Sequence, residues 1–175
     1  MRNWDGDTSK SSQGAALAVI TGTRALGYEY IETEADPMEA LAQTANDLME
    51  KFGRLDPEWG EVNRIVRGDV SVPLDGAPDV LRAIYADRDG VAKDGVMNAF
   101  AGDSHIFIAD WAPDGSLRVD SIHNYGSATL DETSPHYADQ VELFANGGYK
   151  PVAMTLEAVL KEATRDYRPG QGTAD

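Results

Sequence analysis

The stretch Ser104–His123, with the sequence SHIFIADWAPDGSLRVDSIH, predicts an antiparallel β-hairpin. Two segments rich in β-branched and aromatic residues flank the loop Ala112–Ser116. In this loop Pro113 and Asp114 fit the two central positions of a type I turn, and Gly115 fits the left-handed bulge position that follows. Because a three-residue loop of this kind sets the register of its flanking strands, the sequence also predicts which residues lie opposite one another.

The predicted register places Asp110 opposite Arg118, and this opposite-charge pair supports the register independently of the turn. It also places His105 opposite His123 at the open end of the hairpin. Since side chains alternate between the two faces of a strand, large apolar residues gather on one face. We expect that face to be buried, and it carries Phe107, Trp111, Leu117 and Val119.

The segment from Asp36 to Phe52 predicts a helix with clear signals at both ends. Asp36 suits the N-cap, Pro37 suits the first helical position, and Glu39 completes a capping box. Gly53 can take the left-handed conformation that ends a helix. Apolar residues recur at steps of three and four and form one stripe: Met38, Leu41, Ala45, Leu48 and Phe52.

An earlier helix is predicted over residues 9–24, with Gly22 closing it. Its candidate N-caps are three serines, Ser9, Ser11 and Ser12. The apolar run Ala15–Ile20 is also compatible with a buried strand, and its alanine content favours the helix.

A last helix is predicted over residues 155–166, with Thr155 as its N-cap. Between these elements, residues 61–73 are predicted to be extended, residues 77–87 to form a short helix or a loop, and residues 125–149 to be mostly loop. No repeat or linker divides the sequence, so we treat residues 1–175 as a single region of the α+β class.

Composition excludes several classes of function. The 175 residues include 15 Lys and Arg against 30 Asp and Glu, giving a net charge of −15. No basic stripe is available for nucleic-acid phosphate or anionic lipid, so neither is an expected partner.

The absence of cysteine excludes disulfides, a thiol nucleophile and a thiolate zinc site. The longest apolar run, Ala15–Ile20, is far shorter than the roughly 20 residues that cross a bilayer. The first ten residues lack the apolar core of a signal peptide.

His105 and His123 are the candidate metal ligands, because histidines that face each other across two strands can hold a metal ion. A third ligand would have to come from Asp103 or His136. No ligand spacing recurs in the sequence, so we favour the alternative that both histidines are polar residues at the end of a hairpin.

Three places in the sequence offer a candidate serine nucleophile. Ser134, His136 and Asp139 lie within six residues, but the members of a catalytic triad converge from separate elements, which favours a structural role here. Gly115-Ser116 and Gly126-Ser127 resemble self-cleavage sites that would release an N-terminal serine. The first lies in the hairpin turn, and the second leaves too short a remainder for a catalytic domain, so we interpret both as structural.

Four stretches resemble the C-terminal part of the β subunit in the penicillin acylase family. They are NWDGDTSKSSQGAAL (3–17), WGEVNRIVRGDVSVPLDGAPDVLRA (59–83), GDSHIFIADWAPDGSLRVDSIHNYGSAT (102–129) and SPHYADQVELFANGGYKPV (134–152). The closing helix follows them in the family's order. The resemblance is nearest to the acyl-homoserine-lactone and aculeacin acylase branch.

The resemblance implies the αββα sandwich of the N-terminal-nucleophile hydrolases. It also implies an amidase activity on linear amide C–N bonds of N-acyl compounds such as penicillins and acyl-homoserine lactones, reactions of antibiotic metabolism and quorum quenching. In the family, the serine that begins the β subunit is the nucleophile, and its own α-amino group is the base. A backbone N–H and an asparagine side chain form the oxyanion hole.

The segment that matches lies downstream of these catalytic parts. No residue of this chain aligns with the serine nucleophile, the oxyanion asparagine or the family's calcium ligands, so we expect no catalytic residue, metal or cofactor here. Six residues do match positions of the family's motifs, and we interpret those motifs as structural. They are His123, Ser127, Ser134, His136, Tyr137 and Gln140.

The resemblance therefore predicts the C-terminal fragment of an acylase, inactive by itself. A truncated gene, a misplaced start codon or a split enzyme would each give such a chain. Its partners would be the α subunit, the N-terminal part of the β subunit and, in the complete enzyme, a small N-acyl substrate. Family resemblance implies a periplasmic or secreted enzyme. The alternative is a stand-alone, non-catalytic binding domain, which should not expose a large apolar surface.

Overall fold

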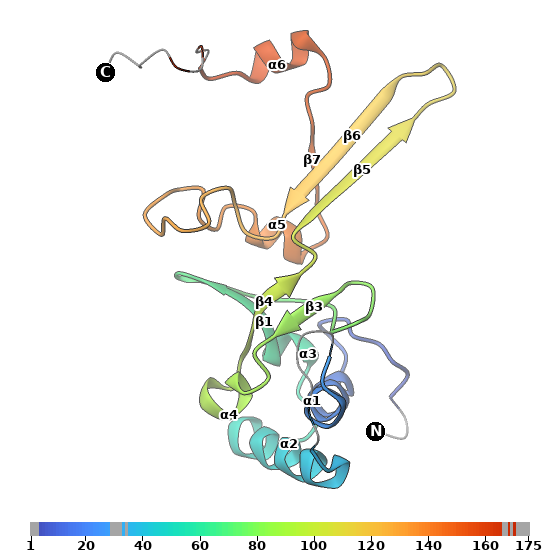
Figure 1. Cartoon of the computed structure of the whole chain (residues 1–175), viewed down its shortest axis with the longest axis vertical. Helices are drawn as coiled ribbons and strands as arrows, with labels where there is room; N and C mark the ends of the chain where they lie inside the picture. Colours follow the sequence, from blue (N-terminus) through green and yellow to red (C-terminus); the bar gives the residue numbers. More distant parts are fainter. Residues whose placement is uncertain (1–3, 29–32, 34, 166–167, 169, 171–175) are drawn as a thin grey trace.

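The computed structural model describes residues 4–28, 33, 35–165, 168 and 170. The protein is elongated, with helices and a four-stranded sheet at one end and the predicted hairpin projecting from the other end (Figure 1). The combination of helices and sheets confirms the α+β class predicted from the sequence. Within the described part of the chain, no helix is both long and apolar enough to span a membrane.

The first helix, α1 (Ala15–Leu26), begins later than predicted. The residues before it are used differently: the backbone carbonyls of Lys10 and Ser12 accept hydrogen bonds from the backbone N–H groups of Gly60 and Trp59, both at 2.8 Å. Ser9, Ser11 and Ser12 consequently precede the helix without capping it, and the N-cap is Gly14. Gly22 lies inside the helix, which ends instead at Gly27, where φ is +72°.

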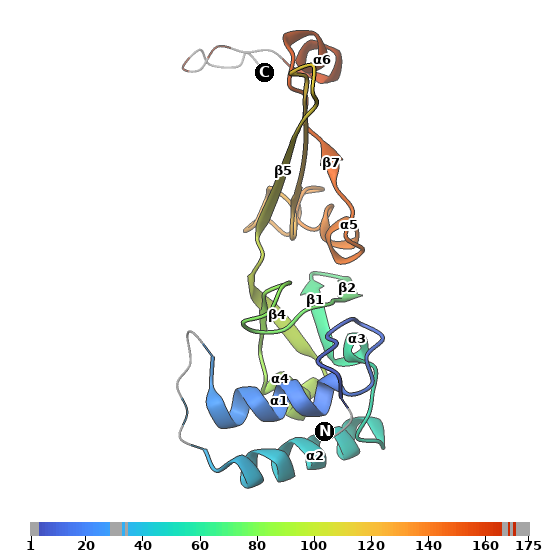
Figure 2. The same ribbon diagram turned by 90° about the vertical axis from the view of Figure 1, so that its right-hand side faces the viewer.

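The second helix, α2 (Pro37–Phe52), has the predicted bounds and packs against α1 (Figure 2). Asp36 Oδ1 accepts hydrogen bonds from the N–H groups of Met38 (2.8 Å) and Glu39 (3.0 Å), which is the predicted N-cap. Gly53 ends the helix in the left-handed conformation, as predicted.

The predicted apolar stripe of α2 is confirmed except at its first residue. Leu48 is buried, and Leu41, Ala45 and Phe52 are partly buried, whereas the side chain of Met38 is 70% exposed. Ala40 and Thr44 are also buried. The reason is a polar contact with α1: Arg24 Nη1 donates to Thr44 Oγ1 at 3.0 Å, and Arg24 Nη2 lies 2.7 Å from Asp47 Oδ2. These contacts turn the Thr44 side of α2, rather than the Met38 side, towards α1.

The four-stranded sheet has the strand order β2-β1-β4-β3. A short helix, α3 (Trp59–Val62), leads into the antiparallel pair β1 (Asn63–Arg67) and β2 (Val70–Pro73), which lies in the segment predicted to be extended. Strand β4 (Met97–Gly102) pairs in parallel with β1 and antiparallel with β3 (Ile84–Ala86).

Residues 77–87 contain β3, so the short helix considered for this segment is wrong and the loop alternative holds for its first part. Helix α4 (Gly90–Asp94) and strand β4 were not predicted. One apolar core lies between the helices and this sheet, and its largest fully buried side chains are Trp59, Ile20, Leu48 and Met97.

The hairpin consists of β5 (His105–Trp111) and β6 (Leu117–His123), and its register is the predicted one at every residue pair. Arg118 Nη2 lies 3.7 Å from Asp110 Oδ2, as the register requires. A short strand, β7 (Lys150–Pro151), pairs with β6 on the side away from β5.

The predicted burial of one hairpin face is wrong for its aromatic residues. Val119 is buried, but the side chains of Phe107 and Trp111 are 56% and 67% exposed. The hairpin extends away from the four-stranded sheet, and only its base packs on the second apolar core (Figure 1). Ile122 contributes to that core, together with Phe144 of α5 (Val141–Ala145).

The last helix, α6 (Leu156–Glu162), starts at the predicted N-cap, where Thr155 Oγ1 accepts from the N–H of Ala158 at 3.1 Å. It ends earlier than predicted because Ala163 has an extended backbone. The predicted end at Asp166 lies outside the described residues. None of the residues of α6 is buried.

Candidate functional site

The six motif residues lie at the end of β6 and along the loop of residues 124–140 that follows it. The N–H of His123 donates to Gln140 Oε1 at 3.2 Å, and the N–H of Gln140 donates to the carbonyl of Tyr125 at 2.7 Å. Gln140 is buried, so its side chain holds the start and the end of the loop together.

A tight turn at residues 134–137 forms the far side of this loop. Ser134 Oγ accepts from the N–H of His136 at 3.2 Å, and the carbonyl of Ser134 accepts from the N–H of Tyr137 at 3.1 Å. The carbonyl of His136 accepts from the N–H of Ala128 at 3.1 Å and packs against Gly126. A Cβ at Gly126 would lie 2.1 Å from that carbonyl oxygen, so the turn requires glycine there. Ser127 is exposed.

Arg67, at the end of β1, anchors this loop to the four-stranded sheet. Its guanidinium lies over the ring of Tyr137, 3.8 Å from the centroid, and over the ring of Tyr125 at 4.6 Å. Its Nε donates to the carbonyl of Tyr137 at 3.4 Å, and its Nη2 donates to the carbonyl of Thr129. Burial raises the pKa of Tyr125 above its usual 10.0, and the nearby Arg67 charge opposes that rise.

Arg67 was not predicted as a functional residue, although the sequence carries one signal for such an arginine. A long loop poor in regular structure has many carbonyl groups that need donors, and an arginine with five N–H groups is suited to several of them. Arg67 and Tyr137 are 70 residues apart, so only the fold could show which arginine meets the loop.

Ser134, His136 and Asp139 lie together without forming a nucleophile–base pair. His136 Nδ1 lies 2.9 Å from Asp139 Oδ2, and both side chains are partly or largely exposed. The hydroxyl of Ser134 is bonded to the backbone N–H of His136 rather than to its imidazole. The arrangement stabilises a turn and provides no activated hydroxyl.

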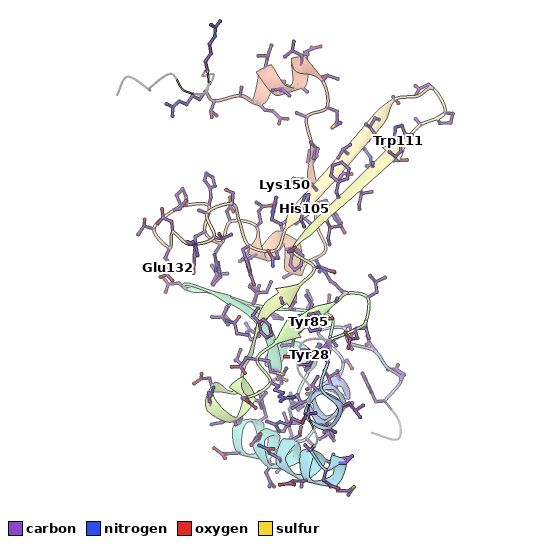
Figure 3. The ribbon with its side chains drawn as sticks, in the orientation of Figure 1. Tyr28, Tyr85, His105, Trp111, Glu132 and Lys150 are labelled. Carbon is purple, nitrogen blue, oxygen red and sulfur yellow. The ribbon has the colours of Figure 1, made fainter. Side chains whose placement is uncertain are left out.

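His105 and His123 stack face to face, with ring centroids 4.7 Å apart and planes inclined by 24°. Figure 3 shows His105 at the base of the hairpin. The two residues named as third ligands are engaged elsewhere: Asp103 Oδ2 lies 3.8 Å from Arg82 Nε, and His136 pairs with Asp139. Across the described ranges, no group of three or more His, Cys, Asp or Glu side chains is placed to hold a metal ion.

The first Gly-Ser peptide lies in the hairpin turn and the second in the loop of residues 124–140. The N–H of Ser116 donates to Asp114 Oδ1 at 2.9 Å inside the hairpin turn, and the carbonyl of Ser116 accepts from the N–H of Ala112 at 2.9 Å. Gly126 is buried against the carbonyl of His136.

A cleft of about 680 Å³ lies where the four-stranded sheet meets the base of the hairpin. Its lining includes the carboxylates of Asp7, Asp75 and Asp103, the guanidinium of Arg82, and the apolar side chain of Leu81. These polar groups are already bonded within the protein. Asp75 Oδ1 accepts from the N–H of Lys10 at 2.5 Å, and Asp7 accepts from the hydroxyl of Ser9 at 2.7 Å, a bond that lowers the pKa of Asp7.

The family model described as penicillin amidase matches residues 1–161, which is almost the whole chain. A search of curated protein sequences found no match.

Proposed function

We propose that this chain, which belongs to the penicillin amidase family, is the C-terminal part of a hydrolase that cleaves linear amide bonds of N-acyl compounds. The match over residues 1–161 carries the proposal. Because the family's serine nucleophile and oxyanion asparagine lie upstream of the matched motifs, the chain would be inactive by itself. It would act together with the α subunit and the N-terminal part of the β subunit.

Within the complete enzyme, the chain would contribute structure around the site rather than reacting groups. Residues 124–140 form the motif loop. The contacts of Arg67 with Tyr125, Tyr137 and Thr129 hold this loop against β1, and Gln140 holds its end against β6. Such contacts hold a long loop in one conformation, which is what a neighbouring catalytic centre requires of its supporting residues.

Exposed apolar residues on α6 support a fragment over a stand-alone binding domain. Leu156 is 74% exposed and Leu160 is 63% exposed, and the helix buries no residue of its own. A short helix with an uncovered apolar side gains little from folding alone, so further chain of the enzyme would cover it.

For the substrate, we favour the acyl-homoserine-lactone and aculeacin acylase branch, because the run of residues 102–140 is the most specific part of the resemblance. Penicillins and related N-acyl compounds are the other substrates to compare. We also propose that the complete enzyme is exported to the periplasm or secreted, as family resemblance implies.

The test is reconstitution. The chain is expressed alone and together with an upstream acylase body that carries the serine nucleophile, and hydrolysis of an acyl-homoserine lactone and of a penicillin is measured. We expect activity only from the combination, and none when the serine of the body is replaced by alanine. Turnover by the isolated chain that survives repeated purification would overturn the proposal, as would a body that is equally active without the chain.

A further inference from the structure

The outer edge of β5 is open for hydrogen bonding. Among the strands that the structure describes, only β6 pairs with β5. The N–H of Ala112 donates to the carbonyl of Ser116, and the N–H of Asn124 donates to that of Ser104, so even-numbered residues of β5 point their backbone groups towards β6. The odd-numbered residues therefore point theirs outwards: His105, Phe107, Ala109 and Trp111.

This edge lacks the features that usually protect an open strand. Seven residues long, it contains no lysine and no proline, and its one charged residue, Asp110, is paired with Arg118. It also exposes apolar side chains, since Phe107, Ile108 and Trp111 are 56%, 42% and 67% exposed. Figure 3 shows Trp111 near the far end of the hairpin, distant from the four-stranded sheet.

We propose that the β5 edge pairs with the β5 edge of a second copy of this chain, antiparallel and centred on Ile108. This inference goes beyond the proposed function, because it concerns the chain in the absence of an acylase body. A two-fold axis at Ile108 is the one register that pairs every residue of His105–Trp111 with a residue of the same strand. The result is a continuous six-stranded sheet, β7-β6-β5 followed by the same three strands of the second copy in reverse order.

The side chains are complementary in this register. Phe107 lies beside the small Ala109 of the second copy, and Trp111 lies beside His105, so large residues do not collide. Asp110 lies beside Ile106 of the second copy, which keeps the two aspartates apart. A register centred on residue 110 would instead place the two Asp110 carboxylates directly opposite each other, which is unfavourable.

The size of the contact and the charge of the chain set the strength of the dimer. Aromatic side chains each bury about 150–250 Å² when fully covered, so three partly exposed apolar residues from each copy fall below the roughly 1,200 Å² of a stable interface. Each copy carries a net charge of −15, so the copies repel one another at low ionic strength. The dimer is therefore weak, and it strengthens with salt as the Debye length falls from about 10 Å at 0.1 M to about 3 Å at 1 M.

Disulfide cross-linking tests the register, because the chain has no cysteine of its own. In the proposed dimer, the two copies of residue 108 are opposed without hydrogen bonds, with Cα atoms about 4.5 Å apart, a distance that a disulfide spans. Ile108→Cys should therefore cross-link rapidly under mild oxidation. The matched control is Asp110→Cys on the same strand. In the proposed register residue 110 lies opposite residue 106 of the second copy, so the two copies of residue 110 are about 13 Å apart.

Sedimentation over a range of protein and salt concentrations tests the association itself. Phe107→Lys should weaken dimer formation by about tenfold, since it adds a charge to the edge and removes an interface aromatic. Leu156→Lys, which adds the same charge at an exposed apolar position of α6, should not, and circular dichroism should show both variants folded. The proposal is overturned by a monomer at every concentration and salt, by cross-linking through residue 110 as fast as through residue 108, or by equal effects of the two lysines.

Discussion

The guanidinium of Arg82 lies over the ring of Phe144, 3.8 Å from its centroid, and Arg82 Nη1 donates to the carbonyl of the same residue at 3.0 Å. Arg82 belongs to the loop before β3, and Phe144 lies on α5 beside the hairpin. The Arg82 side chain therefore links the loop before β3 to α5. Asp103, on the link between β4 and β5, lies 3.8 Å from the same guanidinium.

Replacing Arg82 by alanine should destabilise the protein by about 2–3 kcal/mol, because the change removes a cation–π contact, a hydrogen bond and apolar packing of the side-chain stem together. Arg82→Lys should recover only part of this, since an ammonium keeps the charge but lacks the planar group that stacks on Phe144. Urea unfolding measures both values. Arg118→Ala is the control: its side chain is 70% exposed and its pair with Asp110 is long, so its effect should stay within about 0.5 kcal/mol. Equal effects at the two arginines would contradict this role for Arg82.

The ion pair between α1 and α2 should be the most sensitive polar contact of the helical layer. The Arg24 side chain is 6% exposed, and Asp47 is its charged partner at 2.7 Å. Asp47→Ala would leave a buried guanidinium without a countercharge, and we expect a loss of about 3–5 kcal/mol in thermal or urea unfolding. Glu50→Ala on the same helix removes a carboxylate that is 73% exposed and should change little. A small effect of Asp47→Ala would show that water reaches Arg24.

The pKa of Asp131 should depend on Thr133. The Thr133 hydroxyl donates to Asp131 Oδ1 at 2.6 Å, and the Thr133 N–H donates to it at 3.0 Å, which lowers the pKa of Asp131 below 3.8. Hydrogen bonds to a carboxylate favour its charged form, so their contribution to stability is present above pH 3.8 and is lost as the pH falls through the lowered pKa. Thr133→Ala should move the pKa back towards 3.8, as followed by NMR titration. Thr155→Ala, which removes the cap of α6, should leave Asp131 unchanged.

Local chemistry explains what could be predicted from the sequence. The hairpin register follows from Pro113, Asp114 and Gly115, and the start of α2 follows from Asp36 and Pro37, since each signal acts within a few residues. Met38 was wrongly included in the apolar face of α2, because Arg24, on another helix, holds the Thr44 side of α2 towards α1. Exposure of Phe107 and Trp111 could not be read from alternation, which indicates the apolar face of a strand but not what covers it.

The motif loop was harder to predict than the hairpin because long-range contacts hold it. Gln140 could be assigned to a structural motif from family resemblance, but its bond to the N–H of His123 depends on how the loop returns to β6. The same holds for Arg67, which reaches the loop from β1. In both cases one side chain satisfies backbone groups that secondary structure leaves unpaired, and such partners are fixed by the tertiary fold.

Two glycines should respond oppositely to alanine. Gly126 lies in the motif loop, where a Cβ would come within 2.1 Å of the His136 carbonyl oxygen, a backbone atom that can yield only if the loop moves. Gly126→Ala should therefore push the loop away from β6 and cost about 1–3 kcal/mol of stability.

Gly22 lies inside α1 with no atom within 4 Å of the position that a Cβ would take. Gly22→Ala should therefore stabilise the protein by about 0.5–1 kcal/mol, because alanine has the higher helix propensity. Urea unfolding gives both values, and hydrogen exchange locates the change: protection of the Gln140 N–H, which donates to the carbonyl of Tyr125, should fall in Gly126→Ala only. If both variants stabilise the protein, the close approach of the two loop segments is wrong.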